Sequence, residues 1–145
     1  MRIDAQVDVK AAPETVYGLV MDPHCLGEWV SIHEDLLEAP SGELKKGSEL
    51  TQCLKVAGRR FKVRWRVAED DCPRRVVWEG RGPVRTQARV VYEFAERDGG
   101  TRFSYANEYE LPGGAAGRLA GRAVSRTAQR EMKRSLDRLK GMAEA

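Results

Sequence analysis

Apolar and polar residues alternate along most of the chain, and helical spacing replaces this alternation near the start and at the end. The first alternating segment covers residues 2–9, which is the pattern of a half-buried strand. Residues 12–21 have helical spacing, and Pro13 suits the first helical turn. Asp22 is a suitable cap for a second, shorter helix over residues 23–29. The chain is therefore predicted to begin with one strand and two short helices.

Six further alternating segments, separated by short turn sequences, follow in the middle of the chain. They cover residues 30–38, 49–56, 60–67, 75–80, 85–94 and 101–111. Short turns and strict alternation favour an antiparallel meander with one face exposed to solvent. The segment that contains Trp78 is too short to fix its register, so the sequence leaves open which face of the sheet receives this side chain.

A long helix is predicted from about residue 115 to residue 142, because the apolar spacing there changes to the helical period. Its apolar stripe contains Gly121, Val124, Ser125, Ala128, Met132, Ser135, Leu136, Leu139 and Ala143. A sheet with one apolar face needs a second layer. This helix, roughly 40 Å long at the standard rise per residue, is the one predicted element large enough. We expect the twisted sheet to curl around it.

Three stretches carry a resemblance to a known superfamily. They are "AAPETVYGLVMDPHCLGEW" at 11–29, "RVAEDDCPRRVVWEG" at 66–80 and "DGGTRFSYANEYELPGG" at 98–114, the last followed by a basic helix. The chain resembles bacterial members of the helix-grip superfamily, which includes START domains, birch-pollen-allergen-like proteins and polyketide cyclase/dehydrase-like proteins. The resemblance implies an α+β helix-grip fold in a single domain over residues 1–145. It also implies a cavity, but no shared catalytic signature.

Small residues in the first half of the C-terminal helix point to the same cavity. Gly117, Gly121, Ser125 and Ala128 leave volume between the helix and the sheet unless sheet side chains fill it. The residues alone leave close packing and a cavity equally open, and the resemblance favours the cavity. The side chains or positions predicted to line it are Trp29, His33, Gln52, Trp65, Trp78, Thr86, Tyr105, Asn107, Tyr109, Gly121 and Ser125.

Four polar residues fall on the inward faces of these elements: Gln52, Thr86, Asn107 and Ser125. A buried polar group costs free energy unless it is hydrogen-bonded. Two arrangements satisfy this requirement. The four side chains either converge on a ligand, or they bond to one another, to the backbone or to trapped water. The sequence leaves both open.

Catalysis has weaker support in the sequence. It contains no GxSxG, P-loop, GxGxxG or HExxH motif. Glu79 and Glu108 are candidate general acids or bases only if they are buried, and alternation places Glu108 on the solvent face. Cys53 also alternates outward, with no histidine near it in sequence. No catalytic residue is predicted, and a cyclase- or dehydratase-type enzyme is the alternative to a binding protein.

The stretch "DPHCLGEWVSIH" at 22–33 holds both histidines and looks at first like a metal site. His24 and Glu28 are four residues apart and share a helix face, whereas Cys25 lies about a hundred degrees away. His33 falls on the next strand, and no further Cys or His pair completes a set of ligands. We therefore predict no metal and no other cofactor. The stretch is interpreted as a lid over the cavity, with Trp29 plugging the gap between helices and sheet.

Composition is that of a globular domain, with 41% hydrophobic and 32% charged residues in a chain of 145. No apolar run approaches the length of a membrane span, and the first ten residues lack the apolar core of a secretory signal. The three cysteines, Cys25, Cys53 and Cys72, are an odd number and widely spaced, which indicates a reducing compartment. We expect a cytoplasmic protein, either a monomer or a homodimer.

The net charge of +3 is small, but basic residues gather on one side of the predicted C-terminal helix. They are Arg118, Arg122, Arg126, Arg130, Lys133, Arg134 and Lys140. Such a face is usually only solvated, although it also suits RNA, the ribosome or an anionic membrane. The sequence thus predicts a binder of a small hydrophobic or aromatic molecule, lipid- or polyketide-like. An enzyme is the first alternative and a nucleic-acid or ribosome partner is the second.

Overall fold

The computed structural model describes residues 1–110 and 115–145, with the side chains of residues 1–110 and 125–145. The strands are β1 (Arg2–Val9), β2 (His33–Glu38), β3 (Glu49–Val56), β4 (Arg59–Asp71), β5 (Arg75–Arg81), β6 (Gln87–Arg97) and β7 (Gly100–Tyr109). The helices are α1 (Pro13–Val20), α2 (Leu26–Trp29) and α3 (Ala115–Ala143), with single turns η1 (Pro23–Cys25) and η2 (Pro83–Arg85). The predicted order of elements is confirmed.

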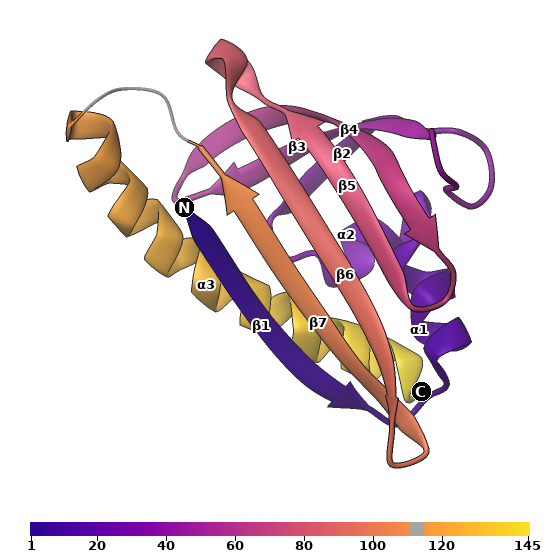
Figure 1. The fold of residues 1–145 in the computed structure, drawn as a ribbon. Helices are drawn as coiled ribbons and strands as arrows, with labels where there is room; N and C mark the ends of the chain where they lie inside the picture. Colours follow the sequence, from indigo (N-terminus) through magenta and orange to yellow (C-terminus); the bar gives the residue numbers. More distant parts are fainter. Residues whose placement is uncertain (111–114) are drawn as a thin grey trace.

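The described strands form one antiparallel sheet of seven, in the order β1-β7-β6-β5-β4-β3-β2. Strands β2 to β7 are the predicted six-stranded meander, and β1 pairs with the last of them, so that Ile3 lies opposite Asn107. The sheet curls, and α3 crosses its inner side beneath β1 and β7 (Figure 1). This is the α+β helix-grip fold that the sequence predicts.

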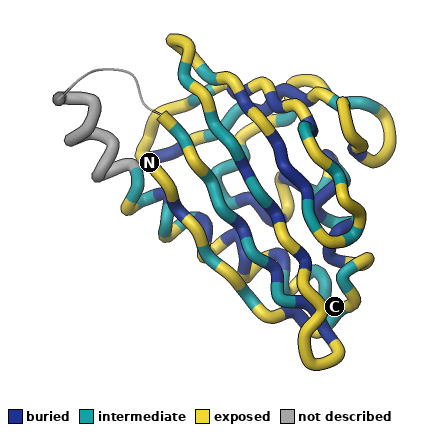
Figure 2. The backbone as a smooth tube through the Cα atoms, viewed as in Figure 1, coloured by how far each residue is buried: buried dark blue, intermediate teal, exposed yellow. Residues whose placement is uncertain are grey.

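The inner face of the sheet and one side of α3 form the hydrophobic core. Burial alternates with exposure along most strands, as the two-residue period of a strand requires (Figure 2). On the described half of α3 the buried residues are Ala128, Met132, Ser135, Leu136 and Leu139. These five belong to the predicted apolar stripe, and they fix which side of α3 meets the sheet.

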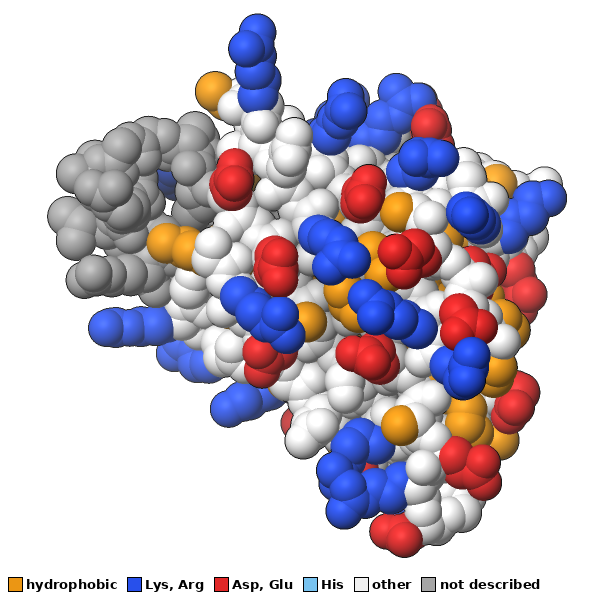
Figure 3. Space-filling view, viewed as in Figure 1, with side chains coloured by type: hydrophobic (Ala, Val, Ile, Leu, Met, Phe, Trp, Pro, Cys, Tyr) orange, Lys and Arg blue, Asp and Glu red, His pale blue; other side chains and the backbone are white. Residues whose placement is uncertain are grey.

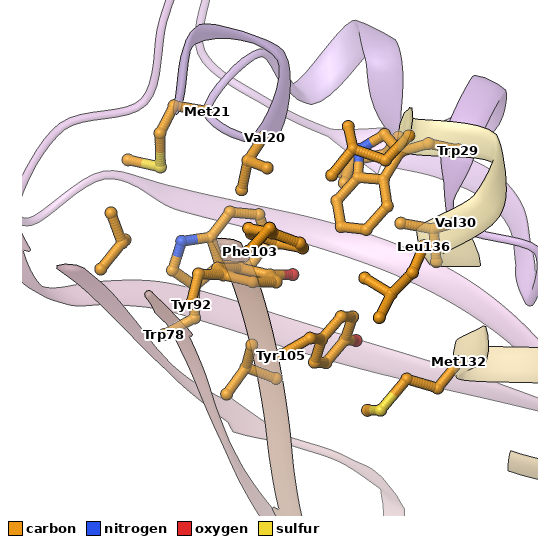
Figure 4. Packing of buried hydrophobic residues seen from close by; sticks show 14 of the residues in the cluster. Val20, Met21, Trp29, Val30, Trp78, Tyr92, Phe103, Tyr105, Met132 and Leu136 are labelled. Atoms are coloured by element: carbon orange, nitrogen blue, oxygen red, sulfur yellow. The ribbon is translucent and has the colours of Figure 1, made fainter. Parts of the chain in front are cut away.

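Trp29, at the end of α2, lies at the centre of an aromatic cluster and is fully buried. Its ring meets those of Tyr92, Phe103 and Tyr105 edge-on, at centroid distances of 6.1, 6.2 and 6.2 Å. Figure 4 shows Tyr92, Phe103 and Tyr105 on the strand side of this cluster, with Trp29 and Leu136 of α3 near one another across from them. The short helix therefore closes one end of the core, as expected of a plug between helices and sheet.

A serine pair fastens the segment after α2 to the long helix. The Ser31 backbone N–H donates to Ser135 Oγ at 2.9 Å, and the Ser31 hydroxyl donates to the Glu131 carbonyl at 2.9 Å. Ser135 is buried, so solvent does not replace these bonds when they are lost. They hold α3 in place beside the cavity described below.

The variant Ser135→Ala is therefore expected to lower the free energy of unfolding by about 1–3 kcal/mol, because it leaves the Ser31 N–H without its acceptor. Urea denaturation measures this change. Ser104→Ala, on the outer face of β7, is the matched control and is expected to stay within about 0.5 kcal/mol of the wild type. Equal stabilities of the two variants would contradict the role given to this pair.

The outer face of the sheet carries a row of alternating charge. Neighbouring strands place these residues side by side in the order Glu49, Arg66, Glu79, Arg89, Glu108, Arg2. Acidic and basic side chains interleave over this face in Figure 3. Lys62 and Arg64 also point outward, as the alternation along β4 requires, but Arg64 pairs with Glu49 at 2.7 Å. Acidic residues on the neighbouring strands thus partly neutralise the outward basic residues of β4.

Candidate ligand-binding site

A cavity of about 130 Å³ lies between the inner face of the curled sheet and α3. Its apolar wall includes Ile3, Val30, Ile32, Leu54, Val56, Phe61, Val63, Ala88 and Met132. Its aromatic rings are Phe61, Trp65, Tyr105 and Tyr109, and α3 contributes Ala128, Glu131, Met132 and Ser135. Residues near both ends of the chain thus line the cavity. It lies between the sheet and the C-terminal helix, the position that the sequence predicts.

A second hollow, larger at about 940 Å³, lies on the outer face of the sheet and is open to solvent. The charged row described above surrounds it, and Trp65 and Tyr109 border both hollows. Exposed ion pairs contribute little, and an open charged surface does not remove an apolar molecule from water. Despite its smaller volume, the inner cavity is therefore the better candidate for a hydrophobic ligand.

Five of the residues predicted for the site lie on the cavity wall: Trp65, Thr86, Tyr105, Asn107 and Tyr109. They come from β4, from β7 and from the loop before β6, three places that the fold brings together. Thr86 was expected in a strand, but it follows the turn η2 and its hydroxyl donates to the Pro83 carbonyl at 2.7 Å. Thr86 nevertheless lines the cavity, because the loop before β6 lies at its wall.

Trp29 and Trp78 are not on the wall. Both are fully buried, and each contacts Tyr92 of β6. Trp78 lies opposite Val67 and Val90 in the register of the sheet, so its side chain faces inward. Tyr105 reaches the wall and packs against Trp29 from there. The two tryptophans therefore pack behind the residues that line the cavity.

His33 and Gln52 lie next to the wall and hold one of its rings. The Trp65 indole Nε1–H donates to Gln52 Oε1 at 3.0 Å, and Gln52 Nε2 lies 2.8 Å from His33 Nδ1. Because the Gln52 oxygen already accepts from Trp65, its Nε2 donates and His33 Nδ1 accepts. This assigns the histidine proton to Nε2. Gly80 completes the site of Trp65, since a Cβ there would lie 2.6 Å from the indole ring.

This chain of hydrogen bonds is expected to make the stability pH-dependent. Burial lowers the pKa of His33, and the charge of Asp35 opposes that effect. Because the folded-state pKa is below the unfolded value of about 6.5, the stabilisation is complete above that pH. It is lost as the pH falls from 6.5 through the folded-state pKa, when protonated Nδ1 no longer accepts from Gln52. Urea denaturation at pH 7.5 and 5.5 measures the loss.

The variant His33→Gln is expected to lose less stability than the wild type over the same pH interval, because it removes the titrating group. His24→Gln, which replaces the exposed histidine, is the matched control and is expected to behave like the wild type. An unchanged pH dependence in His33→Gln would contradict this account of the His33 contact.

Three of the four inward polar residues have protein partners, which favours the second arrangement left open by the sequence. Gln52 bonds to His33 and Trp65, and Thr86 bonds to the backbone. Ser125 bonds to the Tyr109 hydroxyl. Asn107 differs, because its Oδ1 atom is buried without a partner among the described residues. Gly121, also predicted for the wall, lies outside the residues whose side chains are described.

Several wall residues were missed by reasoning from the sequence. Phe61 and Val63 lie on the inward face read for their strand, and Met132 lies on the helical stripe, so the alternation itself contained their signal. Ser135 was on the same stripe, but nothing in the sequence pairs it with Ser31. Glu131 also lies on the wall but was not among the residues predicted to line it.

The titratable groups of the wall are two tyrosines and two glutamates. Burial raises the pKa of Tyr105 to about 12, against a hydrogen bond from Tyr92 that lowers it, so Tyr105 is uncharged at neutral pH. Glu131 is half-buried and forms an ion pair with Arg134 at 3.3 Å, while Glu110 is exposed. Of the two glutamates on the wall, Glu131 is therefore the one whose carboxylate is partly buried.

The stretch at 22–33 brings Val30 and Ile32 to the cavity wall, while Asp22 and His24 at its start make local contacts. Asp22 caps η1 by accepting from the His24 N–H at 3.0 Å, and His24 is exposed. Burial and Asp22 raise the pKa of Cys25 to about 11, so its thiol keeps its proton. Within residues 1–110 and 125–145, no three His, Cys, Asp or Glu side chains are placed to share a metal ion.

The sequence and the fold of this chain are similar to those of known proteins. A family model described as "Polyketide cyclase / dehydrase and lipid transport" matches residues 1–144. The chain belongs to this family. An uncharacterized protein of Mycobacterium tuberculosis strain H37Rv is 28% identical over 99 residues, which are 68% of this chain and 69% of that protein.

Solved structures of similar proteins show the same fold. The aromatase/cyclase Zhui from Streptomyces sp. R1128 has a TM-score of 0.81 at 15% identity, covering 99% of this chain and 93% of its own. The protein TTHA0849 from Thermus thermophilus has a TM-score of 0.80 at 20% identity, covering 99% of this chain and 97% of its own.

In the part of this chain that the structure describes, no helix is long and apolar enough to cross a membrane.

Proposed function

We propose that this protein binds a small hydrophobic or aromatic molecule, lipid- or polyketide-like, in the cavity between the sheet and α3. The observation that carries the proposal is the composition of the wall, where aliphatic and aromatic side chains surround a few polar atoms. Ligand sites of proteins combine these two features, since apolar area supplies affinity and a few polar groups fix orientation. Membership of a family described by polyketide cyclisation and lipid transport supports the same conclusion.

Native mass spectrometry of the protein purified from its own host tests the proposal. A small molecule retained at one copy per chain is expected, and it is expected to be absent from a variant whose cavity is filled, Ala128→Phe. Ala128 lies on the wall, so the added ring takes the place of the ligand. A molecule retained equally by both proteins would place its binding elsewhere and contradict the proposal.

A cyclase- or dehydratase-type enzyme is the second candidate. Glu131 favours it, because this half-buried carboxylate on the wall is a group that can move a proton to or from a bound substrate. Incubation with a β-hydroxy ketone tests it: loss of one water from the wild type but not from Glu131→Gln would support catalysis. Equal rates in the two proteins would exclude Glu131 as the catalytic group.

A polyanion partner ranks last. Arg126, Arg130 and Lys133 are exposed on α3, as predicted, but Lys140 turns to β1 and donates to the Asp8 carbonyl at 3.1 Å. Lys140 also pairs with Glu144, so it does not belong to the free basic face. RNA affinity that does not fall as salt rises would exclude this partner.

The unpaired cysteines support a reducing, cytoplasmic compartment, and the protein is expected to be a monomer or a homodimer.

A further inference from the structure

The charged row on the outer face of the sheet is complementary to its own reverse. It crosses the sheet from β3 to β1 in the order Glu49, Arg66, Glu79, Arg89, Glu108, Arg2. Acidic and basic residues alternate strictly, and the row begins with an acid and ends with a base. When the row is reversed, a basic residue therefore stands at every position where the forward order has an acidic one.

A second copy of the chain reverses the row if the two outer faces meet across a suitable two-fold axis. This axis runs parallel to the strands, over the face and midway between β5 and β6, which are the two central strands of the row. Glu79 then lies opposite the partner's Arg89, and Arg66 lies opposite the partner's Glu108. The two end residues of the row meet in the same way. Two-fold contacts of this self-complementary kind are the commonest in homo-oligomers.

The other two-fold arrangement of the same faces has the wrong charges. An axis along the row sets each residue against its own copy, so that acids meet acids and bases meet bases. Like charges held opposite one another cost free energy and suppress an arrangement. The charge pattern therefore selects the axis parallel to the strands.

The rows beside the charged row fit this axis too. Val77 and Val91 lie opposite each other on β5 and β6, two residues along from Glu79 and Arg89, so an apolar side chain meets an apolar one across the axis. Val91 is half-buried, and Figure 3 shows apolar side chains between the charged ones on this face. Apolar area enclosed by polar residues is the usual composition of a protein interface.

Charges at the centre of the row are not used within the chain. Arg66, Glu79 and Arg89 form no ion pair with another described residue, although they are neighbours in the sheet. Glu108 pairs with Arg2 at 3.3 Å through Oε1 alone. Its Oε2 atom therefore remains available to a second cation, such as a guanidinium of another copy.

The extent of this face suits a weak but specific contact. Strands about 4.8 Å apart and rows about 7 Å apart cover about 600 Å² per chain, or about 1,200 Å² for two chains, which is the low end of specific interfaces. The hollow of about 940 Å³ on the same face leaves room for the long arginine side chains of a second copy. Complementary charge orients two partners more than it tightens their binding, so a weak dimer is expected.

We propose that the protein forms a two-fold homodimer through the outer face of its sheet, with the charged row of one copy reversed against that of the other. The inner cavity and α3 lie on the opposite side of the sheet, so both copies keep their cavities free. The inference goes beyond the proposed function and does not depend on it.

Charge reversal at Arg66 and Glu108 tests this arrangement. Within one chain these residues are three strands apart, on β4 and β7, and they face each other only between chains. Sedimentation velocity at low salt, from about 10 to about 500 µM, covers the affinity of a weak interface. The wild type is expected to dimerise, less so as salt rises. Arg66→Glu and Glu108→Arg are each expected to weaken the dimer at least about tenfold, because like charges then meet at two symmetric contacts.

An equal mixture of the two variants is the most specific sample. In a mixed dimer both contacts join opposite charges again, one through the two new residues and one through the two original ones. The mixture is therefore expected to dimerise within severalfold of the wild type, although neither variant does so alone. Lys133→Glu, an exposed charge reversal on α3, is the matched control and is expected to associate like the wild type.

Three results would overturn the inference: a wild type that stays monomeric, variants that dimerise as well as the wild type, or a mixture as weak as its components. Both positions are exposed, so thermal melts of the variants are expected to match the wild type. If a variant does not fold, dilution of ¹⁵N-labelled wild type decides. Amide shifts on the outer face of β5 and β6 then support the dimer, and their absence contradicts it.

Discussion

Replacing Trp29 by alanine is expected to lower the free energy of unfolding by about 3–5 kcal/mol, the range found for large buried aromatic residues. The ring is fully buried and meets Tyr92, Phe103 and Tyr105 edge-on, so its removal takes apolar area and three aromatic contacts out of the core. It also leaves a hole between α2 and the sheet that the neighbouring rings do not close without moving.

Urea denaturation monitored by circular dichroism measures this loss. Leu37→Ala is the matched control, because Leu37 is 44% exposed on β2 and its truncation is expected to stay within about 0.5–1 kcal/mol of the wild type. A Trp29→Ala protein less than about 1 kcal/mol below the wild type would show that Trp29 does not close the core as described.

Filling the cavity is the second change with a large expected effect. In Ala128→Phe the new ring enters the 130 Å³ space directly, and toluene affinity is expected to fall at least about tenfold because the volume is no longer free. The fold is expected to persist, with a change in unfolding free energy within about 1–3 kcal/mol, since the ring occupies existing space. Calorimetric titration measures the affinity.

Ala95→Phe is the matched control for this variant. Ala95 is exposed on β6, so the same ring is added on the surface, away from the cavity wall. Toluene affinity is expected to stay within about twofold of the wild type in this protein. If Ala128→Phe binds toluene as well as Ala95→Phe does, the ligand does not occupy the space beside α3.

The fold could be predicted well because the signals for it are local and repeated. Alternation predicted the strands and, apart from the strand of Trp78, their inward faces. Pro13 and Asp22 marked the starts of the short helices, and the helical stripe through Met132 and Leu139 identified the side of α3 that meets the sheet. The curl of the sheet around α3 followed from the need of a one-sided apolar sheet for a partner.

The site was predicted only in part, because its details depend on contacts between distant residues. Pattern alone did not tell whether Trp78 would face inward, since the register of β5 is set by its pairing with β4 and β6. Nor did it separate Asn107 from Gln52, because both are inward polar residues and only the folded chain shows which has a partner. The charged row across the sheet likewise appears only when the strands are in register.

Titration of ¹⁵N-labelled protein with toluene, followed through the indole Nε1–H resonances, tests the cavity most directly. Of the three tryptophans, only Trp65 lies on the wall, whereas Trp29 and Trp78 are behind it. The account predicts a saturable shift of the Trp65 resonance larger than those of the other two, and no such shift in Ala128→Phe. Shifts confined to outer-face residues, with Trp65 unchanged, would contradict a ligand site between the sheet and α3.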